Sequence, residues 1–329
     1  MKIIKNHVDD MLAESLDGFA AAHADIITLA ADREYIRRKR NKPGKVALIS
    51  GGGTGHEPLH AGFVGHGMLD AACPGQIFTS PTPNQMLNAA QSVDGGAGVL
   101  FIVKNYSGDM MNFQMASDMI EQNNAMVIVN DDVAVEDSTY TTGRRGVAGT
   151  LIVEKLLGAA AELGHSLAEL KALGDAINKS TASMGVALSS CTVPAAGKPT
   201  FQIGEQEMEV GVGIHGEPGR RRVPLASADE IAQELTGAVI KDLALAPGQD
   251  VILLVNGFGG TPMLELYLMV HAVRKVLAKA GVNPVRYLTG SYVTSLEMAG
   301  CSVSVTIVDQ EMLRLWDAPV HTAALRWGM

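Results

Sequence analysis

Cysteine and aromatic residues are scarce in this sequence of 329 residues. The three cysteines, Cys73, Cys191 and Cys301, are far apart in the chain and form neither a disulfide framework nor a Cys-x-x-Cys metal pattern, so a reducing cytoplasm is the expected compartment. Aromatic residues make up only 5% of the chain, whereas glycine occurs 36 times. Few aromatics and many glycines favour layered α/β structure over an all-β sandwich.

The chain also lacks an excess of positive charge and any long apolar run. The formal net charge of -9 argues against a nucleic-acid surface, which normally carries a basic stripe. The densest basic patches, 37–40 and 220–222, are short and predict solvated faces or partner contacts. No apolar run approaches the ~18 residues of a membrane span, and the N-terminus has no secretory-signal core. We therefore expect a cytoplasmic protein that contacts neither nucleic acid nor membrane.

Apolar spacing in the first half of the chain alternates between the periods of helices and strands. A helix is predicted over 8–29, and buried strands are predicted over 45–50, 99–103 and 126–129. Helical segments lie between and after these strands, including 152–163. Strands that alternate with helices favour a mostly parallel sheet.

The pattern changes after about residue 182. Strands and helices are still predicted there, separated by Pro- and Gly-rich turns: strands over 184–188, 208–214, 251–255 and 303–308, and helices over 226–241, 263–279 and near Leu313. A chain of this length fits two domains. We expect an α/β fold with an N-terminal domain (1–182), whose mostly parallel sheet is flanked by helices, and a C-terminal domain (183–329) with a smaller mixed sheet and helices.

The glycine-rich segment GGGTGHEP (51–58) directly follows the strand predicted over 45–50. Glycines allow the backbone to take positive φ and to approach a ligand closely. The segment is not a dinucleotide fingerprint, because the third glycine of G-x-G-x-x-G would fall on His56. It is not a Walker A loop either, since no Gly-Lys-Ser/Thr follows. We predict a loop that contacts a ligand without being a nucleotide signature.

Residues 56–60 match the H-E-x-x-H pattern of zinc hydrolases. In those proteins a continuous helix places both histidines on one face. Here Pro58 lacks an N–H group and is tolerated only in the first turn of a helix. No third ligand follows at a familiar spacing. A zinc hydrolase is therefore a rival function that the sequence disfavours, and we predict no metal site.

A second polar segment, KNYSGD (104–109), follows the strand predicted over 99–103. In open α/β sheets, ligands bind outside the carboxyl ends of the strands. Asp109 is therefore a candidate base or hydroxyl anchor beside His56. Equally, it could be the N-cap of a helix that starts near Met110.

The segment VGVGIHGEPG (210–219) places His215 between a strand and a turn. A neutral imidazole can act there as a nucleophile or a general base, although an isolated histidine is usually only a satisfied polar group. Asp131-Asp132 could bind Mg²⁺ or could simply end a strand. The segment 143–146 (GRRG) could contact phosphate or could form a turn.

Together these segments resemble the dihydroxyacetone kinase family, specifically its dihydroxyacetone-binding K subunits of the phosphoenolpyruvate-dependent type. The matching stretches cover residues 51 to 329 almost completely. In chain order they are GGGTGHEPLHAGFVGHGMLDAACPGQIFTSPTP, KNYSGDMMNF, DDVAV, GRRGVAGT, CTVPAAGKPTF, EVGVGIHGEPG, VNGFGGTPMLELY, TSLEMAG and LWDAPVHTAALRWG. Asn130 and the basic run 220–222 depart from the pattern, outside the residues implied to be catalytic.

The resemblance implies that His215 forms a covalent hemiaminal with the carbonyl carbon of dihydroxyacetone. His56 is similar in position to the family's acid/base histidine, and Asp109 would bind the hydroxyl that becomes phosphorylated. A bond to the carbonyl selects ketones over polyols such as glycerol, and it holds the hydroxyl in line with a donor phosphate. The residues implied to surround the substrate are Gly53, Thr54, Gly55, His56, Lys104 and Asp109.

The resemblance also implies the partners. Single-chain ATP-dependent members carry a helical nucleotide domain after this region, whereas this sequence ends at Met329. We therefore expect no cofactor on this chain and a separate helical subunit that carries ADP and Mg²⁺. A multiphosphoryl phosphocarrier protein, fed from phosphoenolpyruvate, would recharge that subunit. A homodimer is implied as well. Two rival functions stay open: a non-catalytic, ketone-sensing transcriptional co-regulator, and a kinase subunit for another short ketose such as erythrulose.

Overall fold

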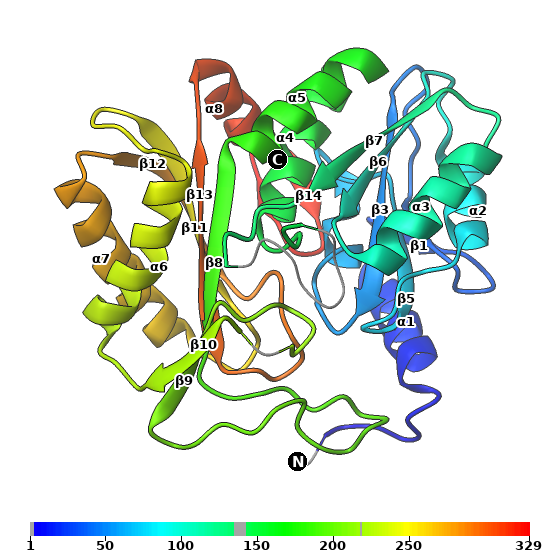
Figure 1. Cartoon of the computed structure of the whole chain (residues 1–329). Coiled ribbons are helices and arrows are strands. Elements are labelled where there is room, and N and C mark those ends of the chain that lie inside the picture. The colour runs from blue at the N-terminus through cyan, green and yellow to red at the C-terminus, as the bar shows by residue number, and fades with distance from the viewer. Residues whose placement is uncertain (1–2, 135–142, 218) are drawn as a thin grey trace.

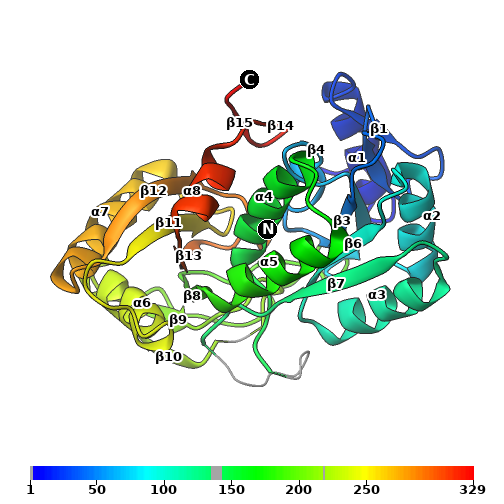
Figure 2. The same cartoon turned by 90° about the horizontal axis from the view of Figure 1, so that it is seen from above.

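The computed structural model describes residues 3–134, 143–217 and 219–329. Val135 and Pro218, which belong to two of the matching stretches, lie outside the described residues. Two six-stranded sheets stand side by side, with helices between them and on both outer faces (Figures 1 and 2). The layers seen from above are therefore helix, sheet, helix, sheet, helix (Figure 2).

The first sheet has the strand order β1-β2-β5-β3-β6-β7. Its central strands β5, β3, β6 and β7 are parallel, and β1 and β2 add an antiparallel edge. Helices α2 (Pro83–Val93) and α3 (Ser107–Met119) cover its outer face (Figure 1). The strands span Ile27–Leu29 (β1), Ile36–Arg38 (β2), Ala47–Thr54 (β3), Ala71–Ile77 (β5), Val99–Lys104 (β6) and Asn124–Val129 (β7). Helix α1 (Met11–Ala22) packs beside β1.

The second sheet has the order β10-β9-β8-β13-β11-β12, and only its β11/β12 pair is parallel. Helices α6 (Ala228–Asp242) and α7 (Met263–Lys279) cover its outer face. Ser227 and Glu230 form a capping box that begins α6. The strands span Thr181–Ala187 (β8), Glu207–Val210 (β9), Arg221–Pro224 (β10), Asp250–Gly257 (β11), Asn283–Gly290 (β12) and Gly300–Ile307 (β13).

Helix α4 (Gly149–Glu162) is the centre of the molecule. It lies with α5 (Leu167–Lys179) between the two sheets and contacts strands of both, including β3, β6, β8 and β13. Its residues 149–161 are all buried, so even Lys155 must find an internal partner, and its Nζ donates to the carbonyl oxygen of Leu315 at 2.7 Å. That bond fixes α8 (Gln310–Asp317) against α4. The largest apolar cluster accordingly contains residues of both halves.

The C-terminal segment returns to the first half of the chain. Strand β14 (Val320–Thr322) pairs with β4 (Gly65–His66) and with β15 (Arg326–Trp327) to form a small third sheet. A short 3₁₀ turn (Ala61–Phe63) precedes β4. Among the described helices, none combines the length and hydropathy that a membrane span requires. The three cysteines are buried and free.

The predicted α/β class is confirmed, with a mostly parallel first sheet and a mixed second one. The second sheet is not the smaller, because both have six strands. The helix predicted over 263–279 has those bounds in the structure, and the other strands and helices predicted after residue 90 are present with shifted ends; β9, the largest departure, ends at Val210 rather than at residue 214. The domain division at residue 182 falls inside β8 and stays a prediction.

Two predictions near the N-terminus were wrong. The helix predicted over 8–29 ends at Ala22, and strand β1 follows because residues 27–29 pair with β2. The strand predicted to end in a turn at Gly51 continues as β3 through the glycines to Thr54. Lack of a side chain allows close neighbours there: a Cβ on Gly51 would lie 2.6 Å from the carbonyl oxygen of Cys73.

Candidate active site

A cleft of about 490 Å³ opens at the carboxyl ends of β3 and β6. This is the edge of a parallel sheet at which open α/β folds bind their ligands. Its size suits a small molecule. Its lining comes from both halves of the chain and consists of Gly53, Phe78, Thr79, Ser80, Tyr106, Ser107, Gly108, Asp109, Asn112 and His215.

His215 lines this cleft and contacts a second histidine, His56, which is not part of the lining. His56 Nε2 lies 3.1 Å from His215 Nε2, although the residues are 159 positions apart. His56 Nδ1 donates to the carbonyl oxygen of Thr294 at 2.7 Å, so the Nε2 of the neutral ring carries a lone pair. His215 therefore donates its Nε2–H to His56. Phe78 stacks on His56, and the ring of Tyr106 meets the edge of His215 at a centroid distance of 4.3 Å.

Both imidazoles are held in the neutral form. Burial lowers the pKa of His215 to about 3, and the positive charges of Lys104 and Arg145 act in the same direction. Burial also lowers the pKa of His56 well below its usual range, with His215 and Lys104 contributing. Among the described residues, Nδ1 of His215 has no hydrogen-bond partner. The pair is thus an uncharged, proton-sharing unit at physiological pH.

The backbone of His215 is fixed by a buried ionic network. Glu217 accepts the His215 N–H at 2.9 Å, and Arg145 Nη1 lies 3.3 Å from the Glu217 carboxylate. Arg145 also donates from Nε to Asp132 at 2.7 Å and from Nη2 to the carbonyl oxygen of Gly211 at 2.7 Å. One guanidinium therefore clamps both ends of the loop that carries His215.

Two residues in segments that the sequence left open, Arg145 and Asp131, have internal partners. Arg145 is only 1% exposed and is occupied by carboxylates, so it offers no phosphate site. Asp131 accepts the N–H groups of Val147 and Gly149 at 2.8 and 2.7 Å and thereby begins α4. Burial raises the pKa of Asp132 to about 6, against the opposing effect of Arg145. Within residues 3–134, 143–217 and 219–329, no group of three or more His, Cys, Asp or Glu side chains is arranged to hold a metal.

Asp109 lies in the first turn of α3 and lines the cleft. The helix begins at Ser107 with Tyr106 as N-cap, so the prediction that Asp109 could be the N-cap was wrong. Its carboxylate Oδ2 lies 3.6 Å from Lys104 Nζ, and both side chains are buried. Burial raises the pKa of Asp109, while Lys104 and a hydrogen bond from Ser80 oppose the rise. The result is a carboxylate that is more basic than a solvated one.

The other residues predicted to surround the substrate do not all line this cleft. Gly53 lines the cleft, whereas Lys104 lies fully buried against Gly52. The hydroxyl of Thr54 donates to the carbonyl oxygen of Gly75 at 3.1 Å and faces a second cavity. Among the four glycines of the loop only Gly55 has a positive φ, of 99°. The other three lie in extended strand and serve close approach instead.

The H-E-x-x-H match has no helical geometry. Residues 56–60 form no α-helix, and the two histidines have separate partners. His56 contacts His215, whereas His60 bonds to Lys104 Nζ and to Glu154. This arrangement removes the structural basis of the zinc-hydrolase alternative.

Sequence reasoning missed the groups that surround the predicted residues. Phe78 and Tyr106 pack on the histidine pair, Thr294 fixes a tautomer, and Glu154 supports His60. Phe78, Tyr106 and Thr294 do stand inside the matching stretches, which is the one signal that could have found them. Thr294 and Glu154 act through contacts that no local pattern encodes.

The neutral state of His215 has a measurable consequence for stability. The unfolded chain protonates this ring below about pH 6.5, whereas the folded protein does so only near pH 3. Because the unfolded state then binds the extra proton, stability is complete above about pH 6.5 and falls as the pH drops. Between about pH 7 and pH 5.5 His215 alone should lower the free energy of unfolding by roughly 1 kcal/mol.

Denaturant unfolding at these two pH values measures the effect. A His215→Ala variant should lose roughly 1 kcal/mol less than the wild type on acidification. His271→Ala, which removes an exposed histidine on α7, is the matched control for loss of an imidazole. Equal losses in the wild type and in His215→Ala would contradict the low pKa.

Comparisons with known proteins agree over nearly the whole chain. A family model described as the Dak1 domain matches residues 17–324. The "PTS-dependent dihydroxyacetone kinase 1, dihydroxyacetone-binding subunit DhaK" of Listeria innocua is 48% identical over 98% of this chain and 100% of its own. The "PEP-dependent dihydroxyacetone kinase, dihydroxyacetone-binding subunit DhaK" of Escherichia coli is 48% identical over 100% of both chains. Among solved structures, the "Dihydroxyacetone kinase operon co-activator Dha-DhaQ" has a TM-score of 0.90 and 32% identity, over 94% of this chain and 97% of that one.

Proposed function

The chain belongs to the Dak1 domain family, and we propose that it is the dihydroxyacetone-binding subunit of a phosphoenolpyruvate-dependent dihydroxyacetone kinase. The observation that carries the proposal is the neutral His56–His215 pair, of which His215 lines a cleft that also contains Asp109. That arrangement provides a nucleophile, a proton carrier and a base in a space suited to a small ketone. The printed functions of relatives that match the full chain support the same assignment.

The first chemical step is addition of His215 to the ketone. As Nε2 of His215 gives up its proton, it forms a bond to the carbonyl carbon, and the carbonyl π bond breaks toward oxygen. The proton on His215 Nε2 passes to His56 Nε2 at 3.1 Å, and His56 returns it to the new alkoxide. The product is a neutral hemiaminal, and no water is lost. A charged His215 could not begin this step, so the low pKa of the ring serves the chemistry directly.

The second step is deprotonation of the terminal hydroxyl. Asp109 accepts this proton as the hydroxyl oxygen attacks the donor phosphorus, and the His56 ring, which contacts His215, is a further acid/base group. The raised pKa of Asp109 makes its carboxylate a better base, and the adjacent Lys104 ammonium keeps it ionised. Anchoring the substrate on His215 holds the hydroxyl in place, which supplies much of the catalysis in phosphoryl transfer. Gly53 leaves the backbone accessible at the floor of the cleft.

The phosphate comes from a separate subunit in this proposal. The glycine-rich segment has no nucleotide fingerprint. We propose that a helical subunit carrying ADP and Mg²⁺ docks over the cleft and that a phosphocarrier protein recharges it. The words "PTS-dependent" and "PEP-dependent" in the relatives' names support that source of phosphate. The homodimer, the cytoplasmic location and the lack of nucleic-acid contact stay predictions.

Reconstitution tests the proposal. The wild-type protein with dihydroxyacetone should show a mass increase of one substrate molecule in native mass spectrometry. Phosphorylated product should form when the nucleotide subunit, phosphocarrier proteins and phosphoenolpyruvate are present. ATP with this chain alone should give none. Product from ATP and the isolated chain would refute the division of labour.

A non-catalytic ketone sensor is the second candidate, and the 32% identical co-activator structure is the observation that favours it. A sensor would form the adduct but give no product in the reconstituted system.

Competition between dihydroxyacetone and erythrulose for the adduct distinguishes the remaining alternative, a kinase subunit for another short ketose. The basic run 220–222 gives no sign of a dedicated docking site, because Arg221 and Arg222 pair with Glu234 and Glu209.

A further inference from the structure

Lys104 belongs to a buried chain of hydrogen bonds that leads away from the cleft. Its Nζ lies 2.9 Å from His60 Nε2, and His60 Nδ1 lies 2.5 Å from Oε1 of Glu154 on the central helix α4. Lys104 and Glu154 are 0% exposed and His60 is 6% exposed. Three ionisable side chains in direct succession inside a protein are costly unless each is paired, so their arrangement is specific.

The positive charge of Lys104 fixes the tautomer of His60. An ammonium group has donors only, so the Nε2 of His60 that faces it must carry the lone pair. The single proton of the neutral ring is then on Nδ1, which donates to Glu154. Burial lowers the pKa of His60 well below its usual range, in keeping with a neutral ring. Glu154 thereby holds the imidazole in the one orientation that accepts from Lys104.

The remaining hydrogens of Lys104 are directed as well. One faces the carbonyl oxygen of Gly51 at 3.3 Å, and the ammonium lies 3.6 Å from the Asp109 carboxylate. With His60 as the third partner, all three donors have defined directions. The ammonium can therefore not rotate or withdraw from Asp109 without breaking a buried hydrogen bond.

Gly52 makes this arrangement possible. A Cβ at this position would lie 2.4 Å from Lys104 Nζ and 3.5 Å from His60 Nε2. The second glycine of the glycine-rich segment thus provides the space in which the ammonium and the imidazole meet. The glycine-rich segment was predicted to contact a ligand, and the contact between Lys104 and His60 explains part of it.

We propose that His60, oriented by Glu154, is a positioning residue that holds the Lys104 ammonium against Asp109 during phosphoryl transfer. This inference rests on the proposed function, because Asp109 is the base of that reaction. It assigns His60 to neither metal binding nor substrate contact. Its effect reaches the substrate only through Lys104 and Asp109.

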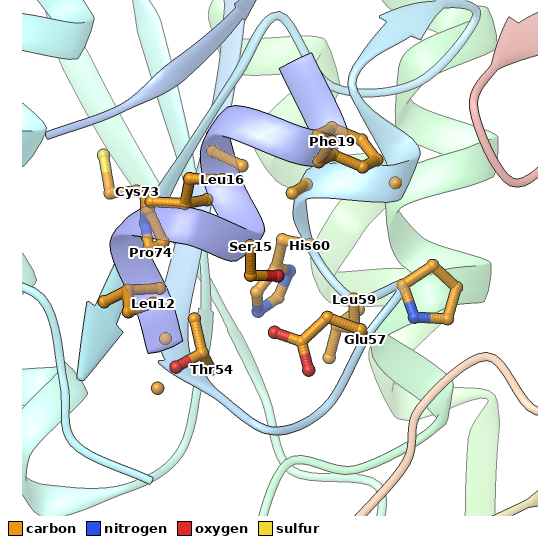
Figure 3. Close-up of a pocket in the computed structure, with 16 residues that line it drawn as sticks. Leu12, Ser15, Leu16, Phe19, Thr54, Glu57, Leu59, His60, Cys73 and Pro74 are labelled. Atoms are coloured by element: carbon orange, nitrogen blue, oxygen red, sulfur yellow. The ribbon is translucent and has the colours of Figure 1, made fainter. Parts of the chain in front are cut away.

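A neighbouring cavity supplies a direct route to test this role. The space between α1 and β3 has a volume of about 310 Å³, and His60 is part of its wall (Figure 3). Ser15 and Glu57, which are exposed, also line it, so the cavity opens to solvent. Removing the imidazole by mutation would extend the cavity to Lys104. Free imidazole could then enter and take the place of the missing ring.

Two substitutions of similar size separate positioning from mere filling of space. In His60→Gln the side-chain amide oxygen reaches the position of Nε2 and can accept from Lys104. In His60→Asn the shorter amide reaches only the position of Nδ1. We expect kcat to fall about 10- to 100-fold in His60→Asn and no more than about threefold in His60→Gln, because loss of alignment at a reacting group has effects of that size.

Chemical rescue is the second readout. The kcat of His60→Ala should fall like that of His60→Asn, and added imidazole should restore it by about tenfold or more. Phe19→Ala enlarges the same cavity from the α1 side and should respond to imidazole no more than the wild type does. Adduct formation on His215 should stay within about twofold of wild type in all variants. Wild-type kcat in His60→Asn, or equal losses in the Asn and Gln variants, would overturn the proposal.

A third readout does not depend on turnover. In ¹⁵N NMR spectra His60 should show the Nδ1–H tautomer that Lys104 imposes by donating to Nε2. An Nε2–H tautomer of His60 in the wild type would refute the hydrogen bond from Lys104 to His60, whether or not the protein is a kinase. If the tautomer is as expected but the wild type gives neither adduct nor product, the proposed function fails. The hydrogen-bond chain of Glu154, His60 and Lys104 then remains as a structural feature.

Discussion

His215→Ala should abolish the covalent adduct with dihydroxyacetone and lower phosphoryl transfer by at least about 10³-fold. The variant loses the only group in the proposal that forms a bond to the substrate. It also loses the anchor that converts a freely diffusing hydroxyl into a positioned one. Native mass spectrometry measures the adduct, and product formation in the reconstituted system measures the transfer.

The variant should remain folded. His215 is neutral, its Nε2 bonds only to His56, and its Nδ1 has no partner among the described residues. Its removal therefore leaves no buried charge unpaired. His271→Ala should form the adduct and turn over like the wild type, because His271 is exposed on α7. An undiminished adduct in His215→Ala would show that another nucleophile holds the substrate.

Asp109→Asn should have the opposite pattern. The adduct should still form, whereas transfer of phosphate should fall by about 10²- to 10⁴-fold. The amide of asparagine has nearly the same shape as the carboxylate but cannot accept the hydroxyl proton. Native mass spectrometry and turnover, measured on the same sample, separate the two functions.

The control for this variant lies on the same helix. Asp118 is exposed near the end of α3, so Asp118→Asn removes one charge from that helix without touching the cleft. It should behave like the wild type in both measurements. Loss of the adduct in Asp109→Asn would instead assign Asp109 to substrate capture. Because the substitution also deprives Lys104 of a carboxylate, unfolding of the variant should be measured alongside.

Much of the fold could be predicted because its strands are buried runs. Residues 99–103 and 251–255 are apolar on both faces, which is how strands of a covered sheet are recognised. The end of α1 was missed because residues 26–29 continue an apolar pattern, yet pair with a strand that the sequence does not mark. The glycines 51–53 suggest a turn locally. They form strand because they pair with β5, and glycine is required at 51 and 52 because atoms of Cys73 and Lys104 occupy the space that side chains would need.

The site was predicted less completely than the fold. His215 was singled out through the family resemblance, since a single histidine between glycines carries little information. His60 was considered only as half of a zinc motif, and the structure gives it a different partner on each nitrogen. Its connection to Glu154 spans 94 residues, and that of His56 to Thr294 spans 238. Contacts over such separations depend on how the sheets and α4 pack, and no local pattern records them.

The residues that form the histidine pair and fix its protons are translated at different times. A ribosome adds His56 and Asp109 early and His215 later, but the carbonyl that fixes the proton of His56 comes from Thr294. A chain that stopped between His215 and Thr294 would contain every proposed catalytic side chain. It would lack the carbonyl oxygen that holds the proton of His56 on Nδ1. It would also lack β13, which separates β8 from β11 in the second sheet. In the proposed mechanism, the nucleophile is therefore competent only on a molecule whose translation has passed that residue.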